Sequence, residues 1–175
     1  EEESRTQLTQ MERLDSLTRL SNRSFFQETI ESYLQNIDER QQQLGIVMID
    51  LNRFKRINES MGHSAGDEIL RTVAQRLENG AAQAVKASEG KLTIKVARLG
   101  GDEFAVVVLR VGQDDALLPV HVSTAVDHLL AELAGTTFDA GDTPLWITGS
   151  AGIALHPRNG RDYSTLLKKA DAALH

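Results

Sequence analysis

Apolar and polar residues follow one another along the first half of the chain in patterns that predict both helices and strands. Residues 23–42 carry apolar side chains at helical spacing, which is typical of an amphipathic helix with one buried face. The continuous apolar run over 44–50, ending in Asp50, indicates a central strand. A short polar helix and a turn are predicted over 52–63, and a long helix is predicted to open at Gly66.

In the second half of the chain, the pattern favours strands joined by short turns. Residues 79–90 carry few bulky apolar side chains, so we expect a loop or a frayed helix end there. Residues 91–98 and 104–110 are predicted to form a β-hairpin whose turn is Gly-Gly-Asp-Glu, residues 100–103. The remaining predicted elements are a loop over 112–119, a helix over 120–134, strands over 136–140 and 145–155 separated by a Gly-Asp turn, a loop over 156–162 and a final helix over 163–175.

Hairpins interleaved with helices favour an α+β fold, with a central, mostly antiparallel sheet flanked by helices. Residues 1–15 form a separate polar helix with a narrow apolar stripe. Two turns of this pattern are too few to distinguish a helix that caps the domain from the end of a coiled-coil linker that arrives from an upstream module. We therefore divide the chain into a linker or signalling helix over 1–15 and one domain over 16–175.

Composition and charge limit the classes of protein that fit the chain. Its 175 residues suffice for one domain and a short extension, and 41% hydrophobic residues allow a sizeable core. The absence of cysteine excludes a disulfide framework and a thiolate metal site, and it suits a reducing compartment. The net charge of −6 argues against a broad DNA-binding face, but not against a nucleotide that a metal ion brings to an acidic site.

The sequence contains no apolar run long enough to span a bilayer and no recognisable signal peptide. We therefore expect a cytoplasmic domain, in a parent protein with or without a membrane anchor. Contacts of this segment with a membrane or with nucleic acid are not expected.

The segment Arg98–Phe104, RLGGDEF, places two glycines and two acids at the start of a strand. A turn needs only one glycine, and adjacent acids repel each other unless a positive charge lies between them. Asp50, Asp102 and Glu103, from two strands that meet at one edge of a sheet, would form a hard oxygen site suited to Mg²⁺. A pair of such ions stabilises both the attacking and the leaving oxygen of a phosphoryl transfer. Taken alone, the Gly-Gly-Asp-Glu segment is better explained as an exposed hairpin turn, and Asp50 as a solvated acid at a strand end.

Four blocks of sequence follow one another from about Asp15 to the end of the chain. They are DSLTRLSNRSFF, IDLNRFKRINESMGHSAGDEIL, RLGGDEF and GSAGIALHPRNGRDYSTLLKKADAAL. Together, and in this order, they resemble the GGDEF family, the diguanylate cyclases. The resemblance implies a nucleotidyl-cyclase-like fold with a ferredoxin-like core. It also implies an enzyme that condenses two GTP molecules into cyclic di-GMP and pyrophosphate, the 3′-hydroxyl of each GTP attacking the α-phosphate of the other within a homodimer.

By this resemblance, the acids and glycines of RLGGDEF have catalytic roles. Gly100 and Gly101, which lack side chains, would let a nucleotide pass close to the backbone. Glu103 would bind metal and assist deprotonation of the 3′-hydroxyl. The ligands implied for Mg²⁺ or Mn²⁺ are Asp50, the Leu51 carbonyl, Asp102 and Glu103.

The resemblance also identifies residues that would bind the nucleotide. Asn58 and Asp67 correspond to the pair that reads guanine. One carboxylate can accept hydrogen bonds from both N1–H and N2–H₂ of guanine, and adenine would leave these polar groups unpaired. Without the resemblance, we would interpret Asp67 as an acid at a helix start and Asn58 as a residue at a helix end. The phosphates would lie on backbone N–H groups at the start of a helix, those of Asn52, Arg53, Phe54 and Lys55.

Two further polar residues receive no ligand role. We interpret His63 as a packed turn histidine, and Arg98 as the partner of a surface acid.

The chain also departs from the family pattern. Asn52 stands where the family often has a second acid, and we expect little loss from this change. The charged residues of the family's R-x-x-D product-inhibition site are absent at 91–94, which predicts no product feedback through that site. A lysine and an arginine of the family's final helix would lie beyond His175, so we expect this chain to bind GTP more weakly than its parent.

Several functions stay open at this point. The first is an active dimeric cyclase controlled by an upstream sensor. The second is a GTP-binding regulatory module attached to an EAL phosphodiesterase domain, because GIALHPRNGRD resembles the variant found in such tandem proteins. The third is a dimerisation domain without a working site, and the fourth is a cyclase that makes a monomeric 3′,5′-cyclic nucleotide. The GGDEF turn argues against the fourth, and the third is disfavoured by the retained polar residues, Asp50, Asn58, Asp67, Asp102 and Glu103.

Overall fold

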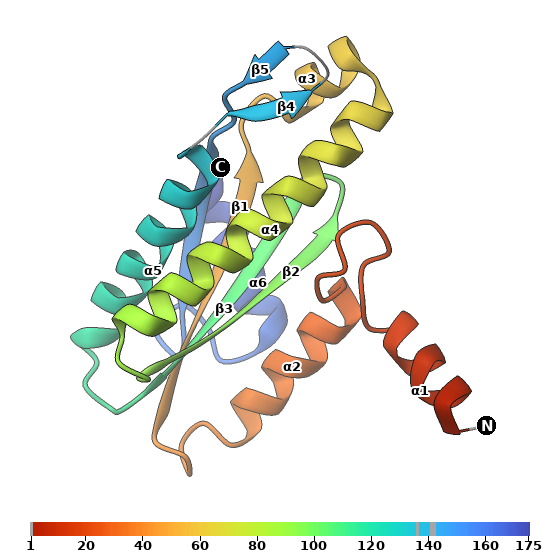
Figure 1. Ribbon diagram of the computed structural model, residues 1–175. Helices are drawn as coiled ribbons and strands as arrows, with labels where there is room; N and C mark the ends of the chain where they lie inside the picture. Colours follow the sequence, from red (N-terminus) through yellow and green to blue (C-terminus); the bar gives the residue numbers. More distant parts are fainter. Residues whose placement is uncertain (1, 136, 141–142) are drawn as a thin grey trace.

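Residues 2–135, 137–140 and 143–175 are described by a computed structural model (Figure 1). They contain one four-stranded antiparallel sheet in the order β2-β3-β1-β6 and a separate two-stranded sheet, β4-β5, which confirms the α+β class. The elements are α1 (Glu2–Met11), α2 (Arg23–Gln35), β1 (Gln42–Leu51), α3 (Phe54–Met61), α4 (His63–Ala87), β2 (Leu92–Gly100), β3 (Glu103–Val111), α5 (Leu117–Ala134), β4 (Phe138–Ala140), β5 (Thr143–Leu145), β6 (Gly149–Leu155) and α6 (Tyr163–Leu174).

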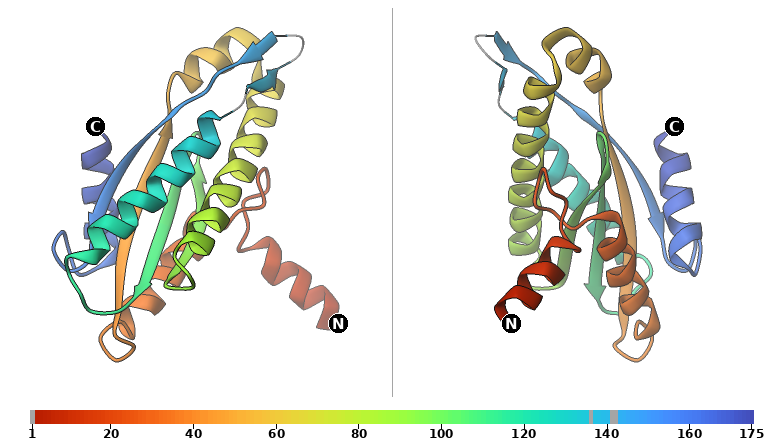
Figure 2. Two further views of the ribbon diagram at one scale, coloured as in Figure 1. Left: turned by 60° about the vertical axis from the view of Figure 1, so that its left-hand side comes forward. Right: turned by 90° about the vertical axis from the view of Figure 1, so that its right-hand side faces the viewer.

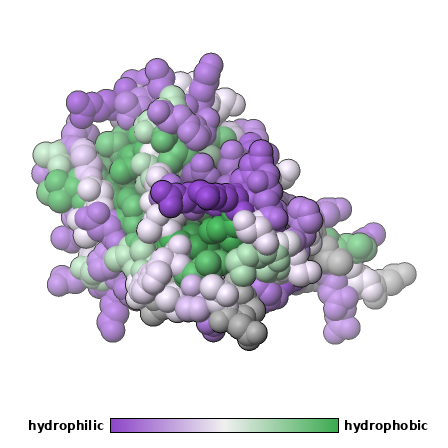
Figure 3. Space-filling model, turned by 90° about the horizontal axis from the view of Figure 1, so that it is seen from above, coloured by the Kyte–Doolittle hydropathy of each residue, from purple (hydrophilic) through white to green (hydrophobic). Residues whose placement is uncertain are grey.

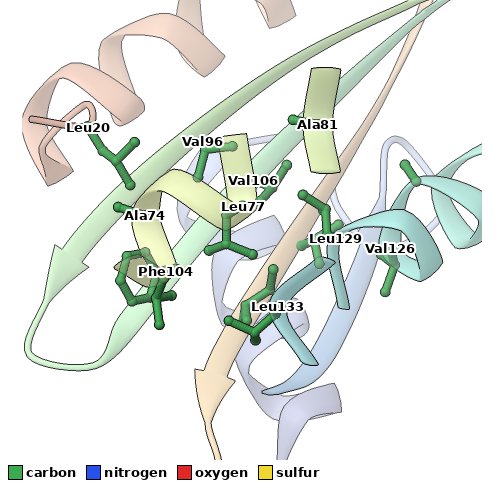
Figure 4. Close-up of a cluster of buried hydrophobic side chains, with 14 of the residues drawn as sticks. Leu20, Ala74, Leu77, Ala81, Val96, Phe104, Val106, Val126, Leu129 and Leu133 are labelled. Carbon is green, nitrogen blue, oxygen red and sulfur yellow. The ribbon is translucent and has the colours of Figure 1, made fainter. Parts of the chain in front are cut away.

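The four-stranded sheet separates two apolar cores. Helices α4 and α5 cover one face, and α2 and α6 cover the other (Figures 1 and 2). Successive side chains of the central strand β1 enter opposite cores, so that Ile49 packs with Phe104 and Leu77 in one core while Met48 packs in the other (Figure 4 shows the first core). Burial on both faces explains why residues 44–50 read as a continuous apolar run.

The prediction of a loop or frayed helix end over 79–90 is wrong for residues 79–87, and only residues 88–90 form a turn. Helix α4 continues to Ala87, and Gly80, Ala81 and Ala84 are buried in it. A Cβ added to Gly80 would lie 2.9 Å from the Cα of Leu129 in α5. The segment lacks bulky apolar side chains because α5 crosses it at close range, and small residues permit that approach.

Three other predicted boundaries are displaced. Helix α2 ends at Gln35 rather than at residue 42, although Ile37 still reaches the core from the turn that follows. Helix α5 begins at Leu117 rather than at residue 120. Helix α4 begins at His63, before the predicted glycine, so Asp67 lies in its second turn and is not an acid at the helix start.

The predicted strand over 145–155 is interrupted. β5 ends at Leu145 and β6 begins at Gly149, and the residues between them connect the small sheet to the main one. Ile147 is fully buried in this connection, so its apolar character reflects burial without strand pairing. The predicted strand over 136–140 is β4, which begins at Phe138. Thr136 and the predicted Gly-Asp turn at 141–142 lie outside the described residues.

Helix α1 extends away from the sheet (Figures 1 and 2). Residues 2–9 are all exposed, and 61% of the surface of Leu8 is accessible to solvent. The helix thus adds nothing to either core over these residues, and the domain boundary at residue 15 stays a prediction. Across the described ranges, no helix combines the length and the apolar character that crossing a membrane requires.

Candidate active site

The three acids of the predicted metal site lie at one end of the central strands. Asp50 is the penultimate residue of β1, and it is paired directly with Glu103, the first residue of β3. Directly opposed residues of antiparallel strands point to the same face of a sheet, so both side chains lie on the face covered by α6. Asp102 immediately precedes Glu103 in the turn. The register of the sheet therefore brings together acids that are 52 residues apart in the sequence.

The carboxyl groups of Asp50 and Asp102 interact directly. Burial raises the pKa of Asp50, and the charge of Asp102, a hydrogen bond between the two carboxyl groups and the charge of Glu103 raise this pKa further. The imidazole of His175 acts in the opposite direction. Like charges held this close disfavour ionisation, and a cation placed between them would remove the penalty.

The metal ligands are not assembled into a complete cluster. Among the residues that the structure describes, no group of three or more acid, histidine or cysteine side chains is close enough to hold a metal ion. Glu103 instead faces Arg23 of α2, with 3.9 Å between Arg23 Nη2 and Glu103 Oε2 and about half of each side chain exposed. The exposed ion pair is weak and easily broken, so Glu103 is free to rotate toward the other acids.

The glycine turn is open to solvent. Gly100 and Gly101 have φ angles of +132° and +52°, which residues with side chains rarely adopt. No heavy atom lies within 4 Å of a Cβ built on either glycine. The turn therefore needs glycine for its backbone conformation, and it leaves space for a group to approach the main chain.

Arg98 attaches this turn to the N-terminal segment. Its Nε donates a hydrogen bond of 3.0 Å to the Gly101 carbonyl, and its Nη1 lies 3.1 Å from both carboxylate oxygens of Asp15. Asp15 Oδ2 also accepts hydrogen bonds from the backbone N–H and the hydroxyl of Thr18. Arg98 does pair with an acid, as predicted, but the side chains of this pair are only 13% and 17% exposed. Asp15 was not identified from the sequence as the partner, although it opens the first of the four blocks.

The two residues predicted to read guanine lie on adjacent helices, Asn58 on α3 and Asp67 on α4. Asn58 packs against Gly66, the residue before Asp67, so closely that a Cβ at position 66 would collide with the side-chain oxygen of Asn58. The Asn58 amide nitrogen also lies 3.2 Å from Nδ1 of His63. His63 is exposed, so its interpretation as a packed histidine is wrong. It contacts a candidate binding residue, a contact that the sequence did not indicate.

The predicted phosphate-binding segment leads from β1 into α3. Arg53 precedes the helix with a φ of +63°, and Phe54 is buried beneath it. The backbone N–H of Asn52 donates to the Thr148 carbonyl, and its side chain bonds the hydroxyls of Thr148 and Ser150, at 2.8 Å in each case. Asn52 therefore ties this segment to β6, and its amide is not free for a phosphate, contrary to the prediction. The amides that open α3, beginning at Phe54, have no acceptor within the helix.

Most of the chain is similar to known proteins. The family profile described as "Diguanylate cyclase, GGDEF domain" matches residues 12–175. The chain is 34% identical over 168 residues to Cyclic di-GMP phosphodiesterase NbdA of Pseudomonas aeruginosa, with 96% of this chain and 19% of NbdA covered. It is 34% identical over 161 residues to Diguanylate cyclase TpbB of the same species, with 92% of this chain and 34% of TpbB covered. The chain thus spans only a minor part of each relative.

The fold is also found in solved structures. The crystal structure of a sensory box/GGDEF family protein from Caulobacter crescentus superposes with a TM-score of 0.79 at 31% identity. The superposition covers 93% of this chain and 95% of that one. The helices and the antiparallel sheet described above therefore correspond to nearly the whole of that solved chain.

Proposed function

Because the chain belongs to the GGDEF family of diguanylate cyclases, we propose that it condenses two molecules of GTP into cyclic di-GMP and pyrophosphate. The observation that carries the proposal is the contact between the carboxyl groups of Asp50 and Asp102 beside an open glycine turn. The charge of Asp102 disfavours ionisation of Asp50, and this cost is offset when a cation binds between the two carboxyl groups. The open turn leaves room for a phosphorylated substrate next to such a cation.

The donor set fits a hard divalent ion, Mg²⁺ or Mn²⁺. Asp50 and Asp102 would supply carboxylate oxygens, the Leu51 carbonyl would supply a third ligand, and Glu103 would add a fourth once its exposed ion pair with Arg23 is broken. When bound, the ion neutralises negative charge on the phosphate oxygens and on the attacking oxygen. Gly100 and Gly101 let the nucleotide lie close to the turn.

The guanine base would bind between α3 and α4. Asp67 accepts hydrogen bonds from N1–H and N2–H₂, and the Asn58 amide pairs with neighbouring atoms of the base. The phosphates lie at the N-terminus of α3, on the amides that follow Asn52, with the Lys55 ammonium nearby. This arrangement holds one GTP in each domain.

Condensation then requires a second copy of the domain facing the first. The 3′-oxygen of one GTP forms a bond to the α-phosphorus of the other, and Glu103 accepts the hydroxyl proton. The bond from the α-phosphorus to its bridging oxygen breaks, and pyrophosphate leaves with the electron pair. A second transfer in the opposite sense closes the ring, so a monomer makes no product.

Product formation from GTP and Mg²⁺ tests this proposal, measured with the purified chain over a range of protein concentrations. We expect the rate per protein molecule to rise with concentration, and we expect Asp102→Ala to abolish it. Asp67→Ala, as a second control, should weaken GTP binding without removing the metal ligands. Failure to form product at any concentration, despite GTP binding that depends on Asp67, would contradict the cyclase.

A second candidate function is a GTP-binding regulatory module attached to an EAL phosphodiesterase domain. The relative NbdA is named a phosphodiesterase, and the chain matches only 19% of it. The activity in that name therefore need not reside in the matched part. In this case the domain would bind GTP and control a neighbouring domain without itself forming cyclic di-GMP.

In either function the domain would work inside a larger signalling protein. We propose a cytoplasmic location, where GTP is available, with a sensor preceding residue 1 in the parent protein. The supporting observation is that α1 extends away from the domain, in a position from which it can connect to other modules (Figure 1). Expression of the parent protein with a tag on this domain, followed by fractionation, tests the location.

A further inference from the structure

We propose that a groove along α3, on the side away from Asn58, is a second nucleotide-binding site, distinct from the proposed guanine site and adjacent to the proposed phosphate-binding segment. The groove has a volume of about 910 Å³ and lies between α3 and the segment that connects β5 to β6. Ligand sites in proteins commonly have volumes of about 300–1,000 Å³. The groove is therefore large enough for a nucleotide.

Two arginines supply positive charge in this groove. Arg53, which precedes α3, and Arg56, in the first turn of α3, both line it. Both are exposed, and across the described ranges no carboxylate oxygen lies within 4.0 Å of either guanidinium. Among the residues that the structure describes, no acid lines the groove, although the chain carries a net charge of −6. Guanidinium groups without a protein partner match the geometry and charge of phosphate oxygens.

An aromatic ring forms the other part of the site. Trp146, the only tryptophan of the sequence, lines the groove and is 67% exposed. Ile57, Met61 and Leu145 add apolar surface beside it. Seen from above in Figure 3, apolar residues are accessible between hydrophilic ones at several points of the surface. A large exposed indole next to unpaired cations suits a ligand with both a planar ring and a phosphate, because a base stacks on the ring while the arginines bind the phosphate.

Helix geometry separates this groove from the proposed guanine site. Asn58 packs toward Gly66 of α4, whereas Arg56, two residues earlier, lines the groove. Residues two apart in a helix point in different directions. A nucleotide in the groove would still lie next to the segment around Asn52, which lines the groove and leads into the proposed phosphate site.

Fluorescence of Trp146 provides a direct test, because no other tryptophan contributes to the signal. The chain with Asp67→Ala, which weakens the proposed guanine site, is titrated with GTP, cyclic di-GMP, guanosine and pyrophosphate. We expect saturable quenching by GTP, by cyclic di-GMP or by both, and binding of guanosine and pyrophosphate weaker by about tenfold or more. The comparison of GTP with cyclic di-GMP identifies whether substrate or product binds. Equal binding of pyrophosphate and the nucleotides would overturn the proposal, as would equal binding of guanosine.

Two variants identify the residues responsible. We expect Arg56→Ala to weaken nucleotide binding by about tenfold. Arg40→Ala is the control and should leave binding unchanged, because Arg40 is exposed and lies just before the start of β1, whereas the groove lies beyond its end. Calorimetry of Trp146→Phe and Trp146→Ala should show retention and loss of affinity, respectively, while circular dichroism verifies folding. Equal affinities of the Arg56 and Arg40 variants, or the absence of saturable quenching, would overturn the proposal. These results do not depend on product formation, so the groove and the cyclase can fail independently.

Discussion

Gly66 lies where α3 and α4 approach each other beside the proposed guanine-binding residues. A Cβ at this position would collide with the Asn58 side-chain oxygen and would lie 3.4 Å from the Phe54 ring. We expect Gly66→Ala to displace the Asn58 amide and to weaken GTP binding by about tenfold, because guanine loses a hydrogen-bonding partner. Calorimetric titrations with GTP and ATP measure the affinity and the preference for guanine.

Gly80→Ala is the matched control in the same helix. Its Cβ would lie 2.9 Å from the Cα of Leu129, so α4 and α5 would have to separate. We expect this variant to lose about 1–3 kcal/mol in the free energy of unfolding, with unchanged GTP affinity in the folded protein. Normal GTP affinity in Gly66→Ala would contradict the proposed role of Asn58.

The pair formed by Asp50 and Asp102 makes a prediction about pH. The pKa of Asp50 is raised by burial and by Asp102, so the folded protein binds this proton more tightly than the unfolded chain does. The pair therefore destabilises the metal-free protein at neutral pH, and this cost disappears as the pH falls through the raised pKa. We expect Asp102→Asn to lower the pKa of Asp50 and to stabilise the metal-free protein at pH 7 by up to about 1 kcal/mol.

Urea unfolding in EDTA measures this stabilisation, and carboxyl NMR titration follows Asp50 directly. Added Mg²⁺ should reverse the order of stability, because only the parent sequence keeps both carboxylates for the ion. A lower stability of Asp102→Asn in EDTA would show that the hydrogen bond between the two groups outweighs their repulsion.

At the scale of elements, the ion pair of Arg98 and Asp15 connects the glycine turn to the segment before α2. Burial tends to raise the pKa of Asp15, but hydrogen bonds from Thr18 and Arg98 lower it below its ordinary value of 3.8. The stabilisation is thus present above pH 3.8 and is lost as the pH falls through the lower, folded-state pKa. We expect Asp15→Asn to cost about 1–3 kcal/mol at pH 7, because Arg98 loses its charged partner in a largely buried position.

Acid titration of the two proteins measures this effect. The stability difference between the parent sequence and Asp15→Asn should shrink as the pH falls below 3.8, because the parent then protonates the same carboxyl. Lys95→Ala, at an exposed position of the same strand β2, is the control and should change stability by less than about 0.5 kcal/mol. A difference that persists unchanged to acid pH would show that Asp15 acts without its charge.

Local patterns predicted most elements, and the failures have physical causes. The strand over 44–50 was predictable because burial on both faces requires an uninterrupted apolar run. The end of α4 was missed because glycine and alanine, which are weak signals of a buried face, are required where α5 crosses it. At Ile147 the error was the reverse, because a strand was predicted where none forms. This residue lies in the segment between β5 and β6, and it is apolar because it is buried.

For the candidate site, the sequence indicated which residues come together better than what each side chain contacts. The acids at 50 and 103 were expected at one edge, and the pairing of β1 with β3 places them there. The ion pair between Glu103 and Arg23 and the ion pair between Arg98 and Asp15 were missed. Such contacts depend on the tertiary path of the chain and have no local signal in the sequence. The same reason explains why the amide of Asn52 was counted as free.

At the scale of the whole molecule, α1 separates the two interpretations of residues 1–15. Residues 2–9 are exposed, and the Asp15 anchor lies after the helix, so these residues of α1 add nothing to either core. We expect deletion of residues 1–11 to change the free energy of unfolding by less than about 0.5 kcal/mol. If α1 pairs two copies through its apolar stripe, the deletion should also shift the protein concentration needed for cyclic di-GMP formation to a higher value.

Urea unfolding and product formation across protein concentrations measure the two effects on the same protein. Deletion of residues 1–15 is the control, because it also removes Asp15 and should lower stability as Asp15→Asn does. A loss of more than about 1 kcal/mol on deletion of 1–11 would identify α1 as a cap of the domain. Unchanged stability together with an unchanged concentration dependence would exclude both a capping helix and a pairing helix. In that case α1 would contribute neither to the stability of the fold nor to the association of two domains with their active sites facing each other.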